Sequence, residues 1–63
     1  MPAPEISFLV QGPDGRCRTV TARTARGALR RFLFGHPREV QHGDIVSIKP
    51  RGAGDWTDFR VTR

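Results

Sequence analysis

The residues of this chain whose type and spacing favour a chemical role are arginines. Residues 16–38 contain seven arginines and no aspartate or glutamate. A guanidinium group is a planar, permanently charged fork that holds two phosphate oxygens at once. A cationic segment attracts a polyanion through its phosphates and needs no sequence code to do so. We therefore predict that the protein contacts nucleic-acid phosphates through Arg16, Arg18, Arg23, Arg26, Arg30 and Arg31.

Overall composition offers a second explanation for the same charge. The 63 residues carry 11 Lys+Arg against 6 Asp+Glu, a net charge of +5, and all the basic residues except Lys49 are arginine. A GC-rich genome favours arginine codons whatever the function. The sequence also lacks a helix-turn-helix, zinc-finger spacing and an aromatic RNA-binding signature. The binding that we expect is therefore weak, salt-dependent and non-specific, and DNA and RNA are both open as ligands.

Other side chains that could do chemistry are few and scattered. His36 and His42 are too few to form a metal site, which needs three or four ligands. Cys17 is the single cysteine, so it cannot form an internal disulfide. Nucleophilic catalysis also needs a base oriented beside the nucleophile, and no motif supplies one. We expect no enzymatic activity, no metal and no cofactor.

The elements that position these residues begin with a hairpin. Apolar and polar residues alternate from Glu5 to Gln11, which predicts a strand with one buried face. Gly12-Pro13-Asp14-Gly15 predicts a tight turn, because proline, aspartate and glycine suit its successive positions. The register that this turn sets pairs Val10 with Arg18, Phe8 with Val20, Ile6 with Ala22, Leu9 with Thr19, Ser7 with Thr21 and Gln11 with Cys17.

A helix is predicted next, over residues 25–34. Thr24 is a suitable N-cap, and Gly35 with the following Pro37 ends the helical pattern. Phe34 lies off the apolar stripe of this helix. We expect the loop over residues 35–43 to cover it; the alternative is an exposed anchor beside Arg30 and Arg31. Val40 is the residue of that loop that we expect to reach the core.

A second hairpin completes the pattern. We predict a strand over residues 45–49, a loop over 50–54 and a last strand over about 55–62. If Val46 and Ile48 face inward, three pairs lie on the outer face of the sheet. These are Lys49 with Trp56, Ser47 with Asp58 and Ile45 with Arg60.

The predicted fold class is α+β, with a ββαββ order: two hairpins form a four-stranded sheet and one helix packs on one face. Residues 5–62 form one small domain, and residues 1–4 form a disordered tail. Strand order stays open; one option is β-grasp-like, with the first and last strands parallel in the middle. The expected core is Ile6, Phe8, Val10, Val20, Ala25, Ala28, Leu29, Phe32, Leu33, Val46, Ile48, Phe59 and Val61.

The outer face of the sheet supports an alternative function. An exposed tryptophan between cationic side chains can stack a base, and tryptophan and arginine are also enriched at protein-interaction hot spots. The alternative is therefore a protein–protein interaction module or homodimer with no nucleic-acid role. Its contact residues would be Leu9, Ile45, Lys49, Trp56 and Arg60. A plainer reading is that Lys49 simply lies along the Trp56 ring.

The apolar pattern also bears on location. No apolar run approaches the roughly 20 residues that a membrane helix requires. The first ten residues lack the basic and apolar regions of a signal peptide. We expect a cytoplasmic protein with no membrane partner.

Overall fold

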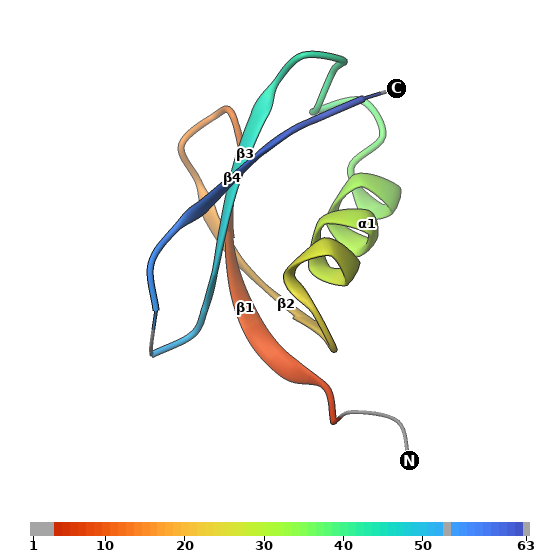
Figure 1. Cartoon of the computed structure of the whole chain (residues 1–63). Helices are drawn as coiled ribbons and strands as arrows, with labels where there is room; N and C mark the ends of the chain where they lie inside the picture. The colour runs from red at the N-terminus through yellow and green to blue at the C-terminus, as the bar shows by residue number, and fades with distance from the viewer. Residues whose placement is uncertain (1–3, 53, 63) are drawn as a thin grey trace.

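The computed structural model describes residues 4–52 and 54–62 of the chain. Most of the predicted tail, residues 1–3, lies outside the described residues, as does Ala53 of the predicted 50–54 loop. The elements follow in the order β1 (Ile6–Gln11), β2 (Cys17–Ala22), α1 (Ala25–Gly35), β3 (Ile45–Pro50) and β4 (Thr57–Arg60). The strands form one antiparallel sheet, and α1 packs on one of its faces (Figure 1). The α+β class is therefore confirmed.

Strand order in the sheet is β2-β1-β3-β4. β1 lies between β2 and β3 and runs antiparallel to both, whereas β4 pairs only with β3. The β-grasp-like option, which needs the first and last strands side by side and parallel, is wrong. The connection after α1 returns the chain to the end of β1, where Gln11 pairs with Ser47. β3 therefore runs back along β1 and occupies the place that β4 would need.

The first hairpin has the predicted register at all six pairs, from Ile6 with Ala22 to Gln11 with Cys17. Its turn closes through the Gly15 amide, which donates to the Gly12 carbonyl at 3.0 Å. The Asp14 carboxylate accepts from the Arg16 amide at 3.1 Å. Gly15 has a φ of 83°, a backbone conformation that glycine adopts without steric cost. The turn residues and the apolar alternation therefore favour the same register of this hairpin.

α1 begins as predicted at the Thr24 cap, whose hydroxyl oxygen accepts from the Gly27 amide at 3.0 Å. The helix ends one residue later than predicted, at Gly35. The His36 amide then donates to the Leu33 carbonyl at 3.3 Å, and the His36 ring nitrogen Nδ1 lies 2.9 Å from the Phe32 carbonyl oxygen. No helix in the described part of the chain is long and apolar enough to cross a membrane.

The second hairpin agrees with two of the predicted outer pairs, Ile45 with Arg60 and Ser47 with Asp58. β4 is shorter than the predicted 55–62 strand, and β3 extends one residue further, to Pro50. Backbone bonding continues past β4, since the Val61 amide donates to the Asp44 carbonyl at 2.8 Å.

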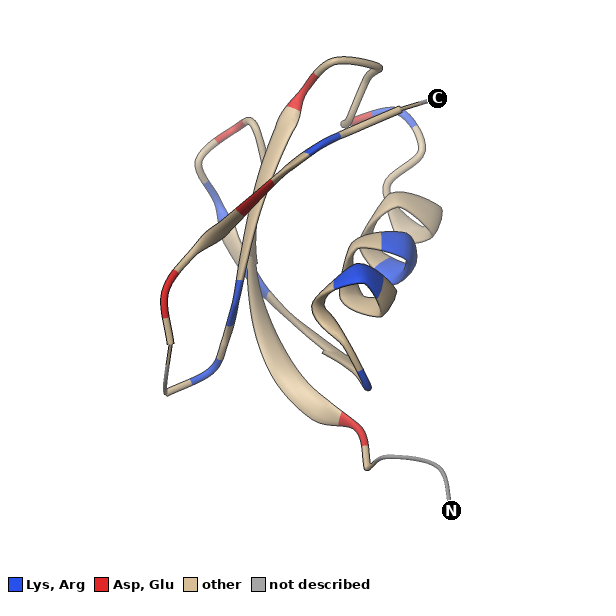
Figure 2. Ribbon diagram, in the orientation of Figure 1, with Lys and Arg blue, Asp and Glu red and all other residues tan. Residues whose placement is uncertain are grey.

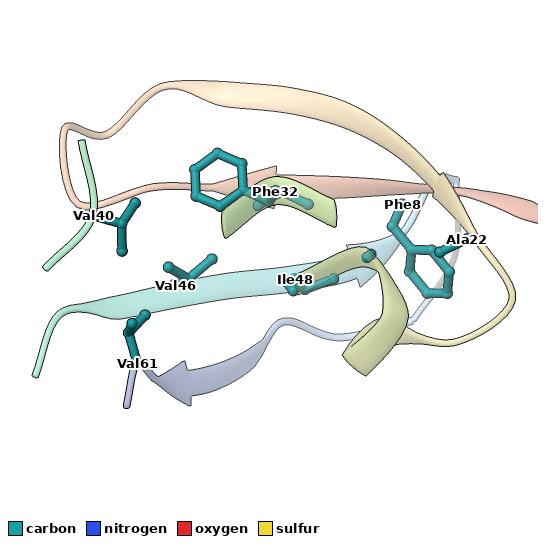
Figure 3. Packing of buried hydrophobic residues seen from close by; sticks show 9 residues of the cluster. Phe8, Ala22, Phe32, Val40, Val46, Ile48 and Val61 are labelled. Carbon is teal, nitrogen blue, oxygen red and sulfur yellow. The ribbon is translucent and has the colours of Figure 1, made fainter. Parts of the chain in front are cut away.

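The core fills the space between the sheet and α1 (Figure 3). Val40 reaches it from the connecting loop, as expected, and Ala22 joins it although it was not predicted to. Ile6 was predicted to be buried but is 44% exposed. It pairs with Ala22 on one side and lies beyond the part of β1 that pairs with β3. The buried residues are Phe8, Val10, Ala22, Ala28, Phe32, Val40, Val46, Ile48 and Val61; Val20, Ala25, Leu29, Leu33 and Phe59 pack partly buried around them.

Candidate nucleic-acid interface

Basic residues gather on α1 and on the turn before it (Figure 2). Arg26 and Arg30 are one helical turn apart, so they share a face of the helix. Arg23 precedes the Thr24 cap. All three side chains are exposed, and none has an ion pair with a carboxylate among residues 4–52 and 54–62. Their charges therefore face solvent unneutralised.

Phe34 extends the same line by one more turn and is 91% exposed. The expectation that the following loop covers this ring is wrong. α1 stays helical to Gly35, so Phe34 remains four residues beyond Arg30 on the solvent side, while the loop sends Val40 into the core. The exposure of the ring agrees with the alternative, although its role as an anchor stays a prediction. We call Arg23, Arg26, Arg30 and Phe34 the α1 stripe.

Arg31 was predicted to be part of the interface, but it is held against the sheet. Its Nη2 donates to the Glu5 Oε1 at 2.6 Å, and its Nη1 donates to the Thr21 carbonyl at 2.5 Å. Glu5 immediately precedes β1 and Thr21 lies in β2, so Arg31 ties α1 to the first hairpin. Its charge is neutralised by Glu5.

Arg18 is also engaged within the protein. Its Nη2 lies 3.3 Å from the Glu39 Oε2 and 3.6 Å from the Asp14 Oδ2. Its guanidinium carbon lies 5.7 Å from the centre of the Phe32 ring, and its Nη1 is buried without a hydrogen-bond partner in the described structure. Arg18 faces inward at the end of the sheet, as the register predicts, and there it covers the core.

Arg16 stands apart from the α1 stripe, beside the first turn. Its side chain is 79% exposed, and its Nε lies 4.0 Å from the Asp14 Oδ2. The Arg16 backbone amide, followed by the cationic side chains of Arg18 and Arg16, lowers the pKa of Asp14 below 3.8, its ordinary value. This carboxylate stays ionised at neutral pH and offsets the attraction of Arg16 for phosphate. The six predicted arginines thus divide into three on the stripe and three beside carboxylates.

A groove of about 390 Å³ separates α1 from β4. α1 packs across β2, β1 and β3 but does not pack against β4 in the described structure. Apolar residues of both elements line the groove, together with arginines of both. Sequence reasoning missed Arg60 as a neighbour of the helix arginines, because that neighbourhood depends on strand order. The lining includes Leu29, Leu33, Phe59, Arg26, Arg30 and Arg60.

On the opposite face of the sheet, Trp56 is 41% exposed, and its ring centre lies 5.0 Å from the Lys49 Nζ. This is the predicted contact. Leu9 pairs with Lys49 in the sheet and lies in the same row. The next row is polar, because the Ser47 hydroxyl donates to the Asp58 Oδ1 at 2.6 Å.

That polar row separates the Trp56 row from the exposed Ile45, which pairs with Arg60 one row further along. The five residues proposed for a protein contact therefore do not form one continuous apolar patch.

Cys17 is exposed at the start of β2. Within the described residues, no group of three or more His, Cys, Asp or Glu side chains could hold a metal ion. Comparisons with protein-family models, with curated proteins and with solved structures found no match to this chain.

Proposed function

We propose that this protein is a small nucleic-acid-binding module that holds the backbone of a single strand along the α1 stripe. The observation that carries the proposal is the contrast among its arginines. Arg23, Arg26 and Arg30 have no carboxylate partner in the described structure, and the line that Arg26 and Arg30 form on α1 ends at the exposed Phe34. Arginines of the same segment that serve the fold are paired with acids.

Unpaired guanidinium groups on a rigid helix suit phosphate binding. Arg26 and Arg30 stand about 6 Å apart along the helix axis, at 1.5 Å per residue. They gain hydrogen bonds to phosphate oxygens without first breaking an internal ion pair. Contacts of this kind position a nucleic-acid backbone and carry no sequence information. The expected binding is therefore non-specific and weakens as salt rises.

Phe34 favours a single strand over a duplex. An exposed aromatic ring beside a cationic line can stack an unpaired base, and such stacking is worth about 1–3 kcal/mol per base. A duplex keeps its base faces inside the helical stack and offers only phosphates to the arginines. Single strands, DNA or RNA, should therefore bind more tightly than a duplex of the same length.

The test is a double charge reversal, Arg26→Glu with Arg30→Glu, with binding to a labelled mixed-sequence single strand followed by fluorescence anisotropy. The matched control is Arg16→Glu with Arg51→Glu, which changes the net charge equally away from the stripe. We expect the first variant to lose binding and the control to retain most of it. Equal losses in both variants would refute the stripe as the site, since net charge alone would then explain the attraction.

The half-exposed Trp56 supports a second candidate function, a protein–protein module or homodimer on the outer sheet face with no nucleic-acid role. Trp56→Ala should then dissolve the assembly, and charge reversal on α1 should have little effect. The polar Ser47–Asp58 row within this face makes it the weaker of the two proposals.

A further inference from the structure

The two edges of the sheet differ in how their backbone groups are used. β2 forms one edge and β4 the other. The Ser7 carbonyl accepts from the Arg51 amide on the β3 side, so the opposite residue, Thr21, directs its carbonyl to the β2 edge. Arg31 donates to that carbonyl at 2.5 Å. The β2 edge is therefore partly capped by the helix.

The β4 edge has no such cap in the described structure. Alternate residues of an antiparallel strand direct their backbone groups to the same neighbour. The Val61 amide donates to the Asp44 carbonyl, and the Gly43 amide donates to the Val61 carbonyl, both at 2.8 Å. By alternation, Phe59 also faces β3, whereas Asp58 and Arg60 direct their amides and carbonyls outward. These groups are available to another strand.

The side chains beside this edge are also incompletely covered. Phe59 is partly buried and lines the groove that α1 leaves open next to β4. Leu29 and Leu33 line the same groove from the helix. An added strand would therefore meet both free backbone groups and apolar surface.

We propose that the added strand is β4 of a second copy of this chain, antiparallel and related by a two-fold axis at Phe59. Only residues whose backbone groups point outward can exchange hydrogen bonds with the second copy, and these are alternate residues of β4. The two-fold axis must therefore pass through a residue and not between two residues. An axis at Asp58 or at Arg60 sets like charges opposite each other, which destabilises a sheet. An axis at Phe59 sets Asp58 opposite Arg60 of the second copy, and Arg60 opposite its Asp58.

This register uses the outward backbone groups, the charged side chains and the incompletely covered Phe59 of the β4 edge together. The outward amides and carbonyls of Asp58 and Arg60 pair across the axis, and two opposite-charge pairs form on the outer face. The two Phe59 side chains meet at a non-hydrogen-bonded pair, where side chains approach most closely. The two sheets become one continuous sheet, and each ring covers the open side of the other groove.

Pairing through β4 does not depend on the proposed nucleic-acid function, because its hydrogen bonds and charge pairs are formed by Asp58 and Arg60 and not by the arginines of the α1 stripe. The two associations are also measured separately. Dimerisation is followed without nucleic acid, whereas strand binding is followed with it and weakens as salt rises. Failure of one proposal can therefore be distinguished from failure of the other.

The test is sedimentation equilibrium of the full chain without nucleic acid, at protein concentrations up to about 1 mM. Asp58→Arg alone and Arg60→Asp alone each set like charges opposite across the axis. Each should raise the dimer dissociation constant about 10-fold or more. The double variant, Asp58→Arg with Arg60→Asp, restores opposite charges and should return the constant to near the wild-type value, although it also lacks the Ser47 contact.

Amide hydrogen exchange gives a second readout that needs no variant. The Asp58 and Arg60 amides should become protected as protein concentration rises, whereas the Phe59 amide is protected at every concentration because it faces β3. A wild-type chain that stays monomeric over the whole range would overturn the proposal. So would a double variant as weak as the single ones, or a dimer that Trp56→Ala dissolves and the charge variants leave intact.

Discussion

The Nη2 atom of Arg31 lies 2.6 Å from the Glu5 Oε1, although the two residues are 26 positions apart. Arg30, its neighbour in the sequence, has no carboxylate partner in the described structure. Consecutive helical residues point about 100° apart around the axis, so one arginine reaches the first hairpin and the next faces solvent. The same residue type is therefore ion-paired with the sheet side at one position and faces solvent at the next, where we propose that it binds phosphate.

This division predicts opposite effects for two neighbouring substitutions. Arg30→Ala should leave the free energy of unfolding unchanged and weaken single-strand binding. The slope of log affinity against log salt should fall in magnitude by about 0.7, the value for one lost phosphate contact. Arg31→Ala should destabilise the fold by about 1 kcal/mol, because it removes an exposed ion pair and a hydrogen bond to a carbonyl.

Denaturant unfolding and a salt series of binding isotherms measure the two quantities for each variant. A loss of stability in Arg30→Ala, or a change in salt slope in Arg31→Ala, would contradict the division of roles.

Phe34→Ala should weaken single-strand binding by about 1–3 kcal/mol, because it removes the stacking ring. Duplex binding should barely change. Thermal stability should stay the same or rise slightly, because the ring is exposed and alanine is the better helix former. Phe34→Trp keeps an aromatic face and is the matched control, with binding near wild type. Equal losses for single strand and duplex would argue against stacking.

Substitutions of Arg18 should affect the stability of the fold more than nucleic-acid binding, because its side chain covers the core. Arg18→Ala uncovers the Phe32 ring and removes a cation–π contact, so it should destabilise the fold by about 1–2 kcal/mol. Arg18→Met keeps apolar cover and a sulfur–aromatic contact, and it removes the buried Nη1 that has no partner. Its stability should therefore exceed that of Arg18→Ala. Neither variant should weaken single-strand binding by as much as Arg30→Ala does.

Asp14 predicts a pH dependence of stability. The Arg16 amide and the nearby cations lower its pKa in the folded state below the ordinary 3.8. A carboxyl group with a lowered folded pKa stabilises the protein above its unfolded pKa and loses that contribution as pH falls through the folded value. Wild-type stability should therefore decline more steeply below about pH 3.8 than that of Asp14→Asn, which suits the same turn position.

Urea unfolding of both proteins at pH values from neutral to strongly acidic measures this difference. If the free energies of unfolding of the two proteins fall in parallel in the acidic range, folding does not lower the pKa of Asp14.

Local patterns were sufficient to predict the elements of this fold. The Gly12–Gly15 turn and the alternation of β1 agreed on one register, and the structure has that register. Thr24 and Gly35 bounded the helix to within one residue. Strand order was not predictable in this way, because the apolar alternation of β3 fits the side of β1 and that of β4 equally well. Ile6 was misassigned for the same reason, since its burial depends on a β3 neighbour that it lacks.

The arginine-rich segment could be recognised from the sequence. Which of its arginines lack a carboxylate partner in the described structure could not be predicted. Arg31 forms an ion pair with Glu5, and Arg18 forms one with Glu39. Both pairs join residues that are far apart in the sequence and become neighbours only in the folded chain. Helical spacing did place Arg26, Arg30 and Phe34 on one face, and this was the available signal for the stripe. The groove between α1 and β4 required the strand order and was missed.

The most direct test of strand binding along the α1 stripe is an amide chemical-shift titration of the labelled protein with a short single strand and with a duplex, at low and at physiological salt. We expect shifts concentrated between Arg23 and Phe34, larger with the single strand and decreasing as salt rises. Shifts centred on Trp56, or no shifts even at low salt, would contradict it.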